Sequence, residues 1–210
     1  MADEDIAGDY DQNVFVNCPF DLPYKPILNA IVFCIVHLGF NPRLASERVD
    51  SGEPRIEKIM DLIEASRFGV HDLSRSQSSK AGELARHNMP LELGLDLGCR
   101  RYGPDHHRRK MHLVLEEKAF RHQASISDLS NSDPVIHRGK PKLALAAIRD
   151  FLEPHSAGDV PGPTEIWDAF GDFQAQMYVE LAARGFSKAD MKRLRMSEYI
   201  GNIRRWAASR

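Results

Sequence analysis

One glutamate of this chain, Glu92, has surroundings typical of a functional carboxylate. It stands in the segment Asn88-Met-Pro-Leu-Glu-Leu-Gly-Leu95, where the early proline and the following apolar residues predict the start of a helix. A carboxylate there could stabilise, or attack, a positively charged sugar carbon, which is the chemistry of glycosidic bond cleavage. The alternative is an ordinary first-turn glutamate in a helix capped by Asn88. The flanking Met and Leu residues favour a functional group, because a solvated helix start rarely surrounds its glutamate with apolar side chains.

A second carboxylate, Asp72, closes a short apolar segment and is followed by Leu73 and Ser74. An aspartate in this place often only caps a turn. However, the carboxyl ends of parallel strands meet at one edge of a sheet, where open α/β proteins bind ligands. We therefore expect the side chains of Asp72 and Glu92 to share a concave pocket. Asn17, at the end of the first predicted strand, is a hydrogen-bonding candidate for the same pocket.

Two groups of basic residues are weaker candidates for binding a ligand. Arg55 lies in the first turn of a predicted helix, where its charge opposes the helix dipole. It could bind a phosphate there, although a solvated surface arginine is the favoured interpretation. The basic, His-rich residues 100–110 could contact phosphate, nucleic acid or metal, but we interpret them as a solvated loop. No metal-ligand spacing occurs among the nine histidines, and no glycine-rich loop follows the first strand, so we expect no metal site and no Walker or Rossmann site.

Short apolar segments alternate with helical patterns along residues 13–153. The first strand contains the run Val14-Phe-Val16 without polar alternation, which is typical of a strand buried on both faces. Ile56, Ile59, Met60 and Ile63 have the spacing of one helix face. Predicted strands cover 13–18, 40–45, 67–71 and 111–115, and predicted helices cover 24–38, the segment around 56–63, 90–99 and 143–152. This alternation predicts an α/β fold with a parallel sheet and helices on both faces.

Three further segments flank this unit: an acidic N-terminal tail over 1–12, a Pro- and Gly-containing linker over 154–163 and a helical C-terminal segment over 164–210. The helical segment carries large apolar side chains at helical spacing, namely Trp167, Phe170, Phe173, Met177, Tyr199, Ile203 and Trp206. Burying each one contributes roughly 1.5–3 kcal/mol. The predicted helix over 24–38 is also apolar around much of its surface. We therefore expect the tail to dock on the α/β domain and a homodimer to cover what remains.

Composition narrows the class of protein. The 210 residues are 42% hydrophobic and 28% charged, which is ordinary for a globular domain, and the net charge of −2 gives no bulk attraction to nucleic acid or anionic membranes. The N-terminal residues do not follow the secretory signal pattern, and the longest apolar run, Ile27 to Leu38, is too short to span a bilayer. The three cysteines fit free thiols in a reducing compartment. We expect a cytoplasmic protein without a membrane or nucleic-acid partner.

Four segments together resemble the TIR-like and nucleoside 2-deoxyribosyltransferase-like superfamily. In chain order they are Phe15-Val-Asn-Cys-Pro-Phe20, Ile59 to Ile63, Val70-His-Asp-Leu-Ser74 and Asn88-Met-Pro-Leu-Glu-Leu-Gly94. Many bacterial members show a strand ending in Asp-Leu-Ser or Asp-Leu-Thr, then an Asn and a Glu-Leu-Gly helix start. The resemblance covers roughly residues 13–153 and implies a flavodoxin-like sheet.

The resemblance also implies an activity, cleavage of the N-glycosidic bond of a nucleotide or nucleoside, with NAD as a candidate substrate and no cofactor. Glu92 corresponds to the catalytic glutamate, which is the nucleophile in the transferases and the stabiliser of the ribosyl cation in NAD-cleaving TIR proteins. Asp72 corresponds to the aspartate that holds or protonates the nucleobase in the transferases. The expected substrate-binding residues are Asn17, Ser74, Asn88 and Arg55.

Several alternatives stay open at this point. The chain lacks the Asp-x-Gly-Thr turn of the transferases and the Trp-Cys pair that precedes the glutamate in TIR proteins. The base, the sugar and the acceptor, whether water or another nucleoside, are therefore undefined. Superfamily members often act as effectors of bacterial antiviral defence, and the transferases complete their active sites across a subunit boundary, which favours a homodimer. The alternative function is a non-catalytic module for nucleotide sensing or TIR-like interaction.

Overall fold

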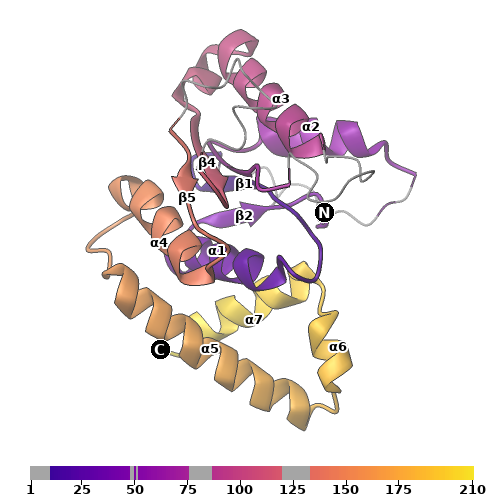
Figure 1. Ribbon diagram of the computed structural model, residues 1–210, viewed down its shortest axis with the longest axis vertical. Coiled ribbons are helices and arrows are strands. Elements are labelled where there is room, and N and C mark those ends of the chain that lie inside the picture. Colours follow the sequence, from indigo (N-terminus) through magenta and orange to yellow (C-terminus); the bar gives the residue numbers. More distant parts are fainter. Residues whose placement is uncertain (1–9, 48–49, 51, 76–86, 120–132) are drawn as a thin grey trace.

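Within the described residues, a sheet of five parallel strands forms the centre of the molecule (Figure 1). The computed structural model describes residues 10–47, 50, 52–75, 87–119 and 133–210. The strands are β1 (Asn13–Asn17), β2 (Asn41–Arg43), β3 (Phe68–Asp72), β4 (Met111–Glu116) and β5 (Val135–Ile136). Their spatial order, β2-β1-β3-β4-β5, is the order of flavodoxin-like folds. The predicted fold class is confirmed.

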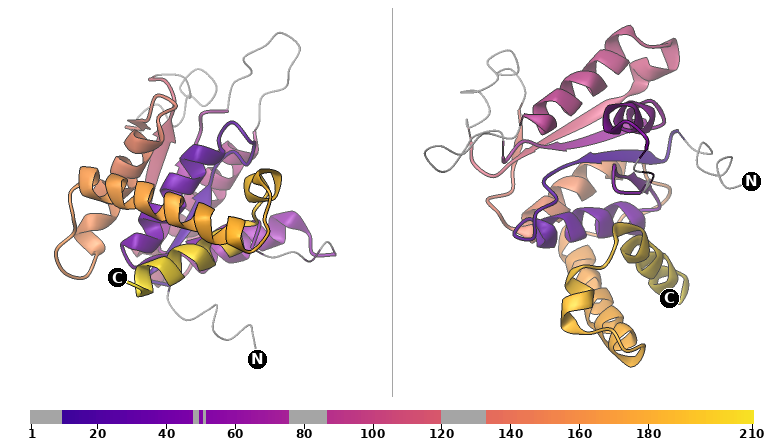
Figure 2. Two further views of the ribbon diagram at one scale, coloured as in Figure 1. Left: turned by 90° about the horizontal axis from the view of Figure 1, so that it is seen from below. Right: turned by 90° about the vertical axis from the view of Figure 1, so that its right-hand side faces the viewer.

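Helices cover both faces of this sheet. Those of the α/β domain are α1 (Lys25–His37), α2 (Arg55–Glu64), α3 (Asn88–Tyr102) and α4 (Pro141–Leu152), and those of the tail are α5 (Pro163–Ala183), α6 (Lys188–Lys192) and α7 (Met196–Ala208). The right-hand view of Figure 2 shows α2 and α3 on one side of the strands and α1, α4 and the tail on the other. Short 3₁₀ turns follow α3 and α4, at Asp105–Arg109 and Glu153–His155.

The strand β1, which lies between β2 and β3, is buried on both faces, as its uninterrupted apolar run predicts. Val14 and Val16 belong to the core under α1 and α4, whereas Phe15 packs on the opposite face with Ile59 and Ile63 of α2. The same alternation applies along β3, where Phe68 and Val70 belong to the core with α1 and α4. Gly69 and His71 therefore point toward α2 and α3, the side on which the candidate site lies. Asp72, the last residue of β3, points to the same face as Phe68 and Val70.

Backbone geometry explains why a glycine stands at position 39 and why a proline is tolerated at position 42. Gly39 follows α1 with φ of +85°, a conformation that favours glycine at helix ends. Pro42 lies inside β2, and this is tolerated because β2 is the edge strand and needs ladder bonds on one side only.

The predicted inward face of α2 is partly wrong. Ile59 and Ile63 are buried as expected, but Ile56 and Met60 are 42% and 38% exposed, and Leu62 is buried instead. At 100° per residue, the buried positions centre on Ile59 and Leu62, which leaves Ile56 and Met60 on the flank of the helix. Ile56 therefore lies at the protein surface, next to the start of the helix.

The C-terminal tail docks on the outer side of α1, which confirms the expectation from its apolar stripe. The ring of Phe33 on α1 lies 5.2 Å from Phe170, 5.4 Å from Phe173 and 5.7 Å from Trp206, measured between centroids. The residues of α1 from Ala30 to Ile35 are fully buried because the sheet covers one side and α5 and α7 cover the other. The homodimer stays a prediction.

None of the helices in the described part of the chain combines the length and apolar character needed to cross a membrane. The three cysteines are free thiols, with Cys18 and Cys34 buried and Cys99 half-buried.

Candidate functional site

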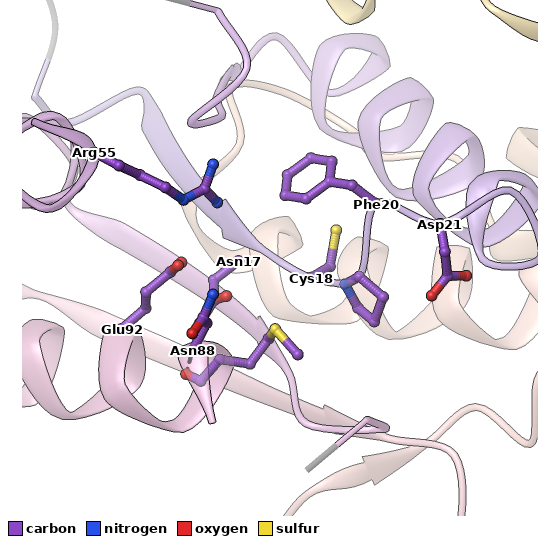
Figure 3. Close-up of a pocket in the computed structure, with 9 residues that line it drawn as sticks. Asn17, Cys18, Phe20, Asp21, Arg55, Asn88 and Glu92 are labelled. Carbon is purple, nitrogen blue, oxygen red and sulfur yellow. Dashed lines mark hydrogen bonds between the residues drawn. The ribbon is translucent and has the colours of Figure 1, made fainter. Parts of the chain in front are cut away.

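A cavity of about 340 Å³ opens at the carboxyl end of β1, between the first turns of α2 and α3 (Figure 3). Its lining residues are Asn17, Cys18, Pro19, Phe20, Asp21, Arg55, Asn88, Met89 and Glu92. The helices that follow β1 and β3 leave the sheet on opposite faces, so this is the topological switch point, where flavodoxin-like folds bind ligands. The volume lies at the small end of the range of about 300–1,000 Å³ that is typical of ligand pockets.

Glu92 is the carboxylate of this cavity. It lies one turn into α3 and only 6% of the residue is exposed. Burial raises the pKa of its carboxyl from 4.5 to about 7, and the positive charge of Arg55 partly opposes this rise. Figure 3 shows the carboxylate and the Arg55 guanidinium pointing toward one another across the cavity. A poorly hydrated carboxylate interacts strongly with positive charge that develops on a ligand, because the surrounding dielectric is low.

Arg55 and Phe20 stand at the mouth of the cavity. Arg55 is the first residue of α2 and is exposed, as expected for a surface arginine, but it also lines the cavity. Its guanidinium and the first amide groups of α2 make this corner suitable for a phosphate group. Phe20 is 45% exposed and offers a ring face on which a planar base can stack. Sequence reasoning missed Phe20, although its place directly after the switch-point strand could have indicated it.

Asn17 is held in one orientation at the floor of the cavity. Its Nδ2 donates to the Met89 carbonyl oxygen at 2.9 Å and lies 3.0 Å from Nδ1 of His71. The amide nitrogen is thus used inside the protein, and the amide oxygen is the atom left to accept a hydrogen bond from a ligand. Burial lowers the pKa of His71, so the imidazole is neutral, accepts at Nδ1 and donates from Nε2.

Nε2 of His71 donates in turn to a buried aspartate, Asp96 of α3, at 3.0 Å. Lys110 Nζ and His112 Nε2 lie 3.0 Å and 3.2 Å from the other oxygen of Asp96. Burial alone would raise the pKa of Asp96, but the neighbouring imidazoles of His112 and His71 hold it far below its usual range. His71, Asp96, Lys110 and His112 form a buried cluster, the Asp96 cluster, which holds Asn17 in place through His71.

Gly69 of β3 makes room for the cluster. A Cβ at this position would overlap Oδ2 of Asp96 and would lie 2.7 Å from Nε2 of His71. Glycine is needed here because side chains approach the strand backbone closely.

The basic segment 100–110 is not wholly the solvated loop that its composition indicates. Its first residues complete α3, and Lys110 and His107 are 1% and 4% exposed. Lys110 is buried because its ammonium group donates to the carbonyl oxygens of Ile63 and Ser66 as well as pairing with Asp96. Arg108 and Arg109 do remain exposed.

Asp72 and Ser74 lie in a different environment, outside the lining of the cavity. Asp72 is fully buried, and its carboxylate accepts hydrogen bonds from the Ser74 backbone N–H at 2.8 Å and from the Tyr24 hydroxyl. Nε2 of His137 lies 3.0 Å from both Oδ2 of Asp72 and Oγ of Ser74. The geometry therefore does not support the expectation that Asp72 and Glu92 share a pocket; Asp72 instead links β3 to α1 and to the segment after β5.

This second cluster is also not arranged for nucleophilic catalysis. The backbone N–H of Gly139 donates to Nδ1 of His137 at 3.1 Å, so the proton of the neutral imidazole sits on Nε2. Nε2 then donates toward Asp72 and Ser74, and it has no lone pair available to take a proton from the Ser74 hydroxyl.

Asn88 does not cap α3, which is the role considered from the sequence. The helix begins at Asn88, two residues before the predicted start, and its N-cap is His87 without a side-chain capping bond. Pro90 is tolerated because it lies within the first turn, where backbone N–H groups have no partner inside the helix. Asn88 instead lines the cavity beside Glu92 (Figure 3).

Within the described ranges, no group of three or more His, Cys, Asp or Glu side chains is arranged to hold a metal ion. Comparisons of the chain with protein-family models, with curated proteins and with solved structures gave no match. The TIR-like and deoxyribosyltransferase-like resemblance therefore depends on the sequence motifs alone.

Proposed function

We propose that this protein cleaves the N-glycosidic bond of a nucleoside or nucleotide in the cavity between β1, α2 and α3. The observation that carries the proposal is Glu92, a carboxylate 6% exposed that lines a cavity of about 340 Å³ at the switch point of the sheet. A group held this way destabilises the folded protein when it ionises, so its position favours a functional role over a structural one.

Glu92 would supply negative charge where the reaction needs it. When the bond between C1′ and the base nitrogen breaks, its electron pair leaves with the base and positive charge develops on the sugar. The ionised Glu92 stabilises that charge, water adds its oxygen to C1′, and a proton from water ends on the base. Removing an electrostatic partner of this kind typically lowers the rate by about 10²–10³.

The other lining residues define the class of substrate. The amide oxygen of Asn17 can accept a hydrogen bond from an exocyclic amine or ring N–H of the base, and Phe20 can stack on the base. Arg55 can bind a phosphate on the sugar. The cavity volume fits a nucleoside monophosphate, and NAD is a candidate if its nicotinamide ribotide half enters the cavity.

The test is release of free base from a panel of ribo- and deoxyribonucleosides, their 5′-monophosphates and NAD, followed by chromatography. We expect base release from at least one member of the panel by the wild type and loss of that release in Glu92→Gln. The matched control is Glu57→Gln, an exposed glutamate of α2 that does not line the cavity, and it should behave as the wild type.

Two outcomes would contradict the proposal. Equal base release by the wild type and Glu92→Gln would remove Glu92 from the chemistry. Saturable binding of a panel member without any release would instead assign the cavity to a nucleotide-sensing module.

A further inference from the structure

A second cavity, larger and more apolar than the first, lies between the start of α1, the middle of α5 and the short helix α6. Its volume is about 720 Å³. It shares no lining residue with the cavity of Glu92, so an inference about its ligand does not rest on the proposed function. Figure 1 shows α5 crossing below α1, with α6 following at its far end.

Apolar side chains form most of the wall. They come chiefly from α5 and α6 and are Trp167, Phe170, Met177, Tyr178 and Met191. Phe170 is buried, Trp167, Met177 and Met191 are half-buried, and Tyr178 is 46% exposed. A tail that docks through the stripe Phe170 and Phe173 thus leaves a concave apolar and aromatic surface in contact with water. Methionine and aromatic side chains together can adapt to a flexible apolar ligand.

The charged groups at this cavity are all positive. Lys25, Lys188 and Lys192 line it, and no Asp or Glu is among its lining residues in the described part of the chain. Lys25 donates to the carbonyl oxygens of Lys192 and Leu194 at 2.6 Å and 3.3 Å, which ties the end of α6 to the start of α1. Lys188 and Lys192 are exposed and place their charges in solvent at one end of the cavity. The whole chain has a net charge of −2, so this positive end is a local feature.

We infer that this cavity binds a small amphipathic anion, an aliphatic carboxylate whose chain lies along α5 and whose carboxylate meets Lys188 and Lys192. The apolar wall provides the contact area, and the lysines select the sign of the charge. A volume of about 720 Å³ is sufficient for a medium or long alkyl chain.

The experiment uses three ligands of equal chain length, decanoate, decanol and decylammonium, with isothermal titration calorimetry of the full chain. Fluorescence provides a second readout, because Trp167 lines the cavity whereas Trp206 is buried in the core. We expect saturable binding of decanoate with a change in Trp167 emission, weaker binding of decanol and no binding of decylammonium. Octanoate should bind about tenfold more weakly than decanoate, because two CH₂ groups are lost.

Charge reversal supplies the matched variants. In Lys188→Glu/Lys192→Glu the affinity for decanoate should fall at least about tenfold. Arg184→Glu/Arg193→Glu changes the net charge equally on exposed residues that do not line the cavity, and it should bind as the wild type does. Trp167→Phe should retain the calorimetric signal and lose the fluorescence change. Circular dichroism checks that each variant is folded.

Several results would overturn the inference. Binding of decylammonium as tight as that of decanoate, or equal binding by the two double variants, would indicate a non-specific detergent effect. Absence of decanoate binding would also overturn it, whether the cavity is open or is covered by a second copy of the chain as detected by sedimentation velocity.

Discussion

Substitution of Glu92 by Gln should stabilise the protein in a pH-dependent way. Folding raises the pKa of the Glu92 carboxyl from 4.5 to about 7, chiefly through burial. Well below pH 4.5 the carboxyl is protonated in both states and costs no stability. As the pH rises toward 7 the unfolded chain loses this proton first, so the wild type becomes progressively less stable, and above about pH 8 the loss is complete.

The size of this change in stability follows from the two pKa values of Glu92, 4.5 in the unfolded chain and about 7 in the folded protein. Their difference corresponds to at most about 3.4 kcal/mol, and access of water to the cavity reduces this to about 2–3 kcal/mol. Gln has nearly the shape of the protonated acid and does not ionise. The stability of Glu92→Gln relative to the wild type should therefore increase by about 2 kcal/mol between about pH 5 and pH 8.5.

Urea denaturation at these two pH values, followed by circular dichroism, measures this difference directly. Other titrating groups are common to both proteins and cancel in the comparison. Glu57→Gln, at an exposed position of α2, should show the same small effect at both pH values. If the advantage of Glu92→Gln were equal at the lower and the higher pH, Glu92 would not be the desolvated carboxylate that the cavity geometry describes.

Three other perturbations test separate parts of the structure. Arg55→Gln should raise KM for nucleoside 5′-monophosphates about tenfold or more and leave KM for the nucleosides nearly unchanged, because Arg55 lines the cavity and is the residue we propose to bind the phosphate. Equal effects on both substrates in steady-state kinetics would refute that role. Gly69→Ala should lower stability to denaturant by about 3 kcal/mol, because its Cβ would overlap the Asp96 cluster. The control is Gly98→Ala, whose Cβ would meet nothing within 4 Å and which should stabilise α3 by about 0.5–1 kcal/mol. Similar losses of stability in Gly69→Ala and Gly98→Ala would contradict the close contact between Gly69 and Asp96. A chain ending at Glu153 should aggregate in light scattering because it uncovers α1, whereas a soluble, cooperatively folding truncation would show that tail docking is dispensable.

The sheet was predictable because its signals are local. The apolar run Val14-Phe-Val16 and the turn residue Gly39 identify a buried strand and a helix end from the sequence alone. The two-residue strand β5 and the short helix α6 were not predicted, because they have too few residues to show a period. The inward face of α2 was assigned incorrectly for Ile56 and Met60, because apolar spacing does not show where the sheet lies.

The candidate site was only partly predictable for a related reason. Glu92, Asn17, Asn88 and Arg55 do meet at one cavity, since they sit at strand and helix ends that the topology brings together. Asp72 also ends a strand, but its carboxylate is used internally by Tyr24 and His137, a long-range arrangement that the sequence around Asp72 does not show. The sequence gives only a weak indication of the Asp96 cluster. Asp96 is an aspartate among the leucines of α3, and β3 contains a glycine that could make room for it.

The central claim is that ionised Glu92 stabilises the sugar cation during base release. Its most direct test is a single-turnover experiment at about pH 8.5, where Glu92 is ionised, with enzyme in excess over the best substrate of the panel, comparing the wild type with Glu92→Gln. We predict a base-release rate about 10²–10³ lower in Glu92→Gln, with the dissociation constant for the substrate changed by no more than a few-fold. Equal rates in the two proteins, or a variant that loses binding while its bound-state rate is retained, would contradict this account.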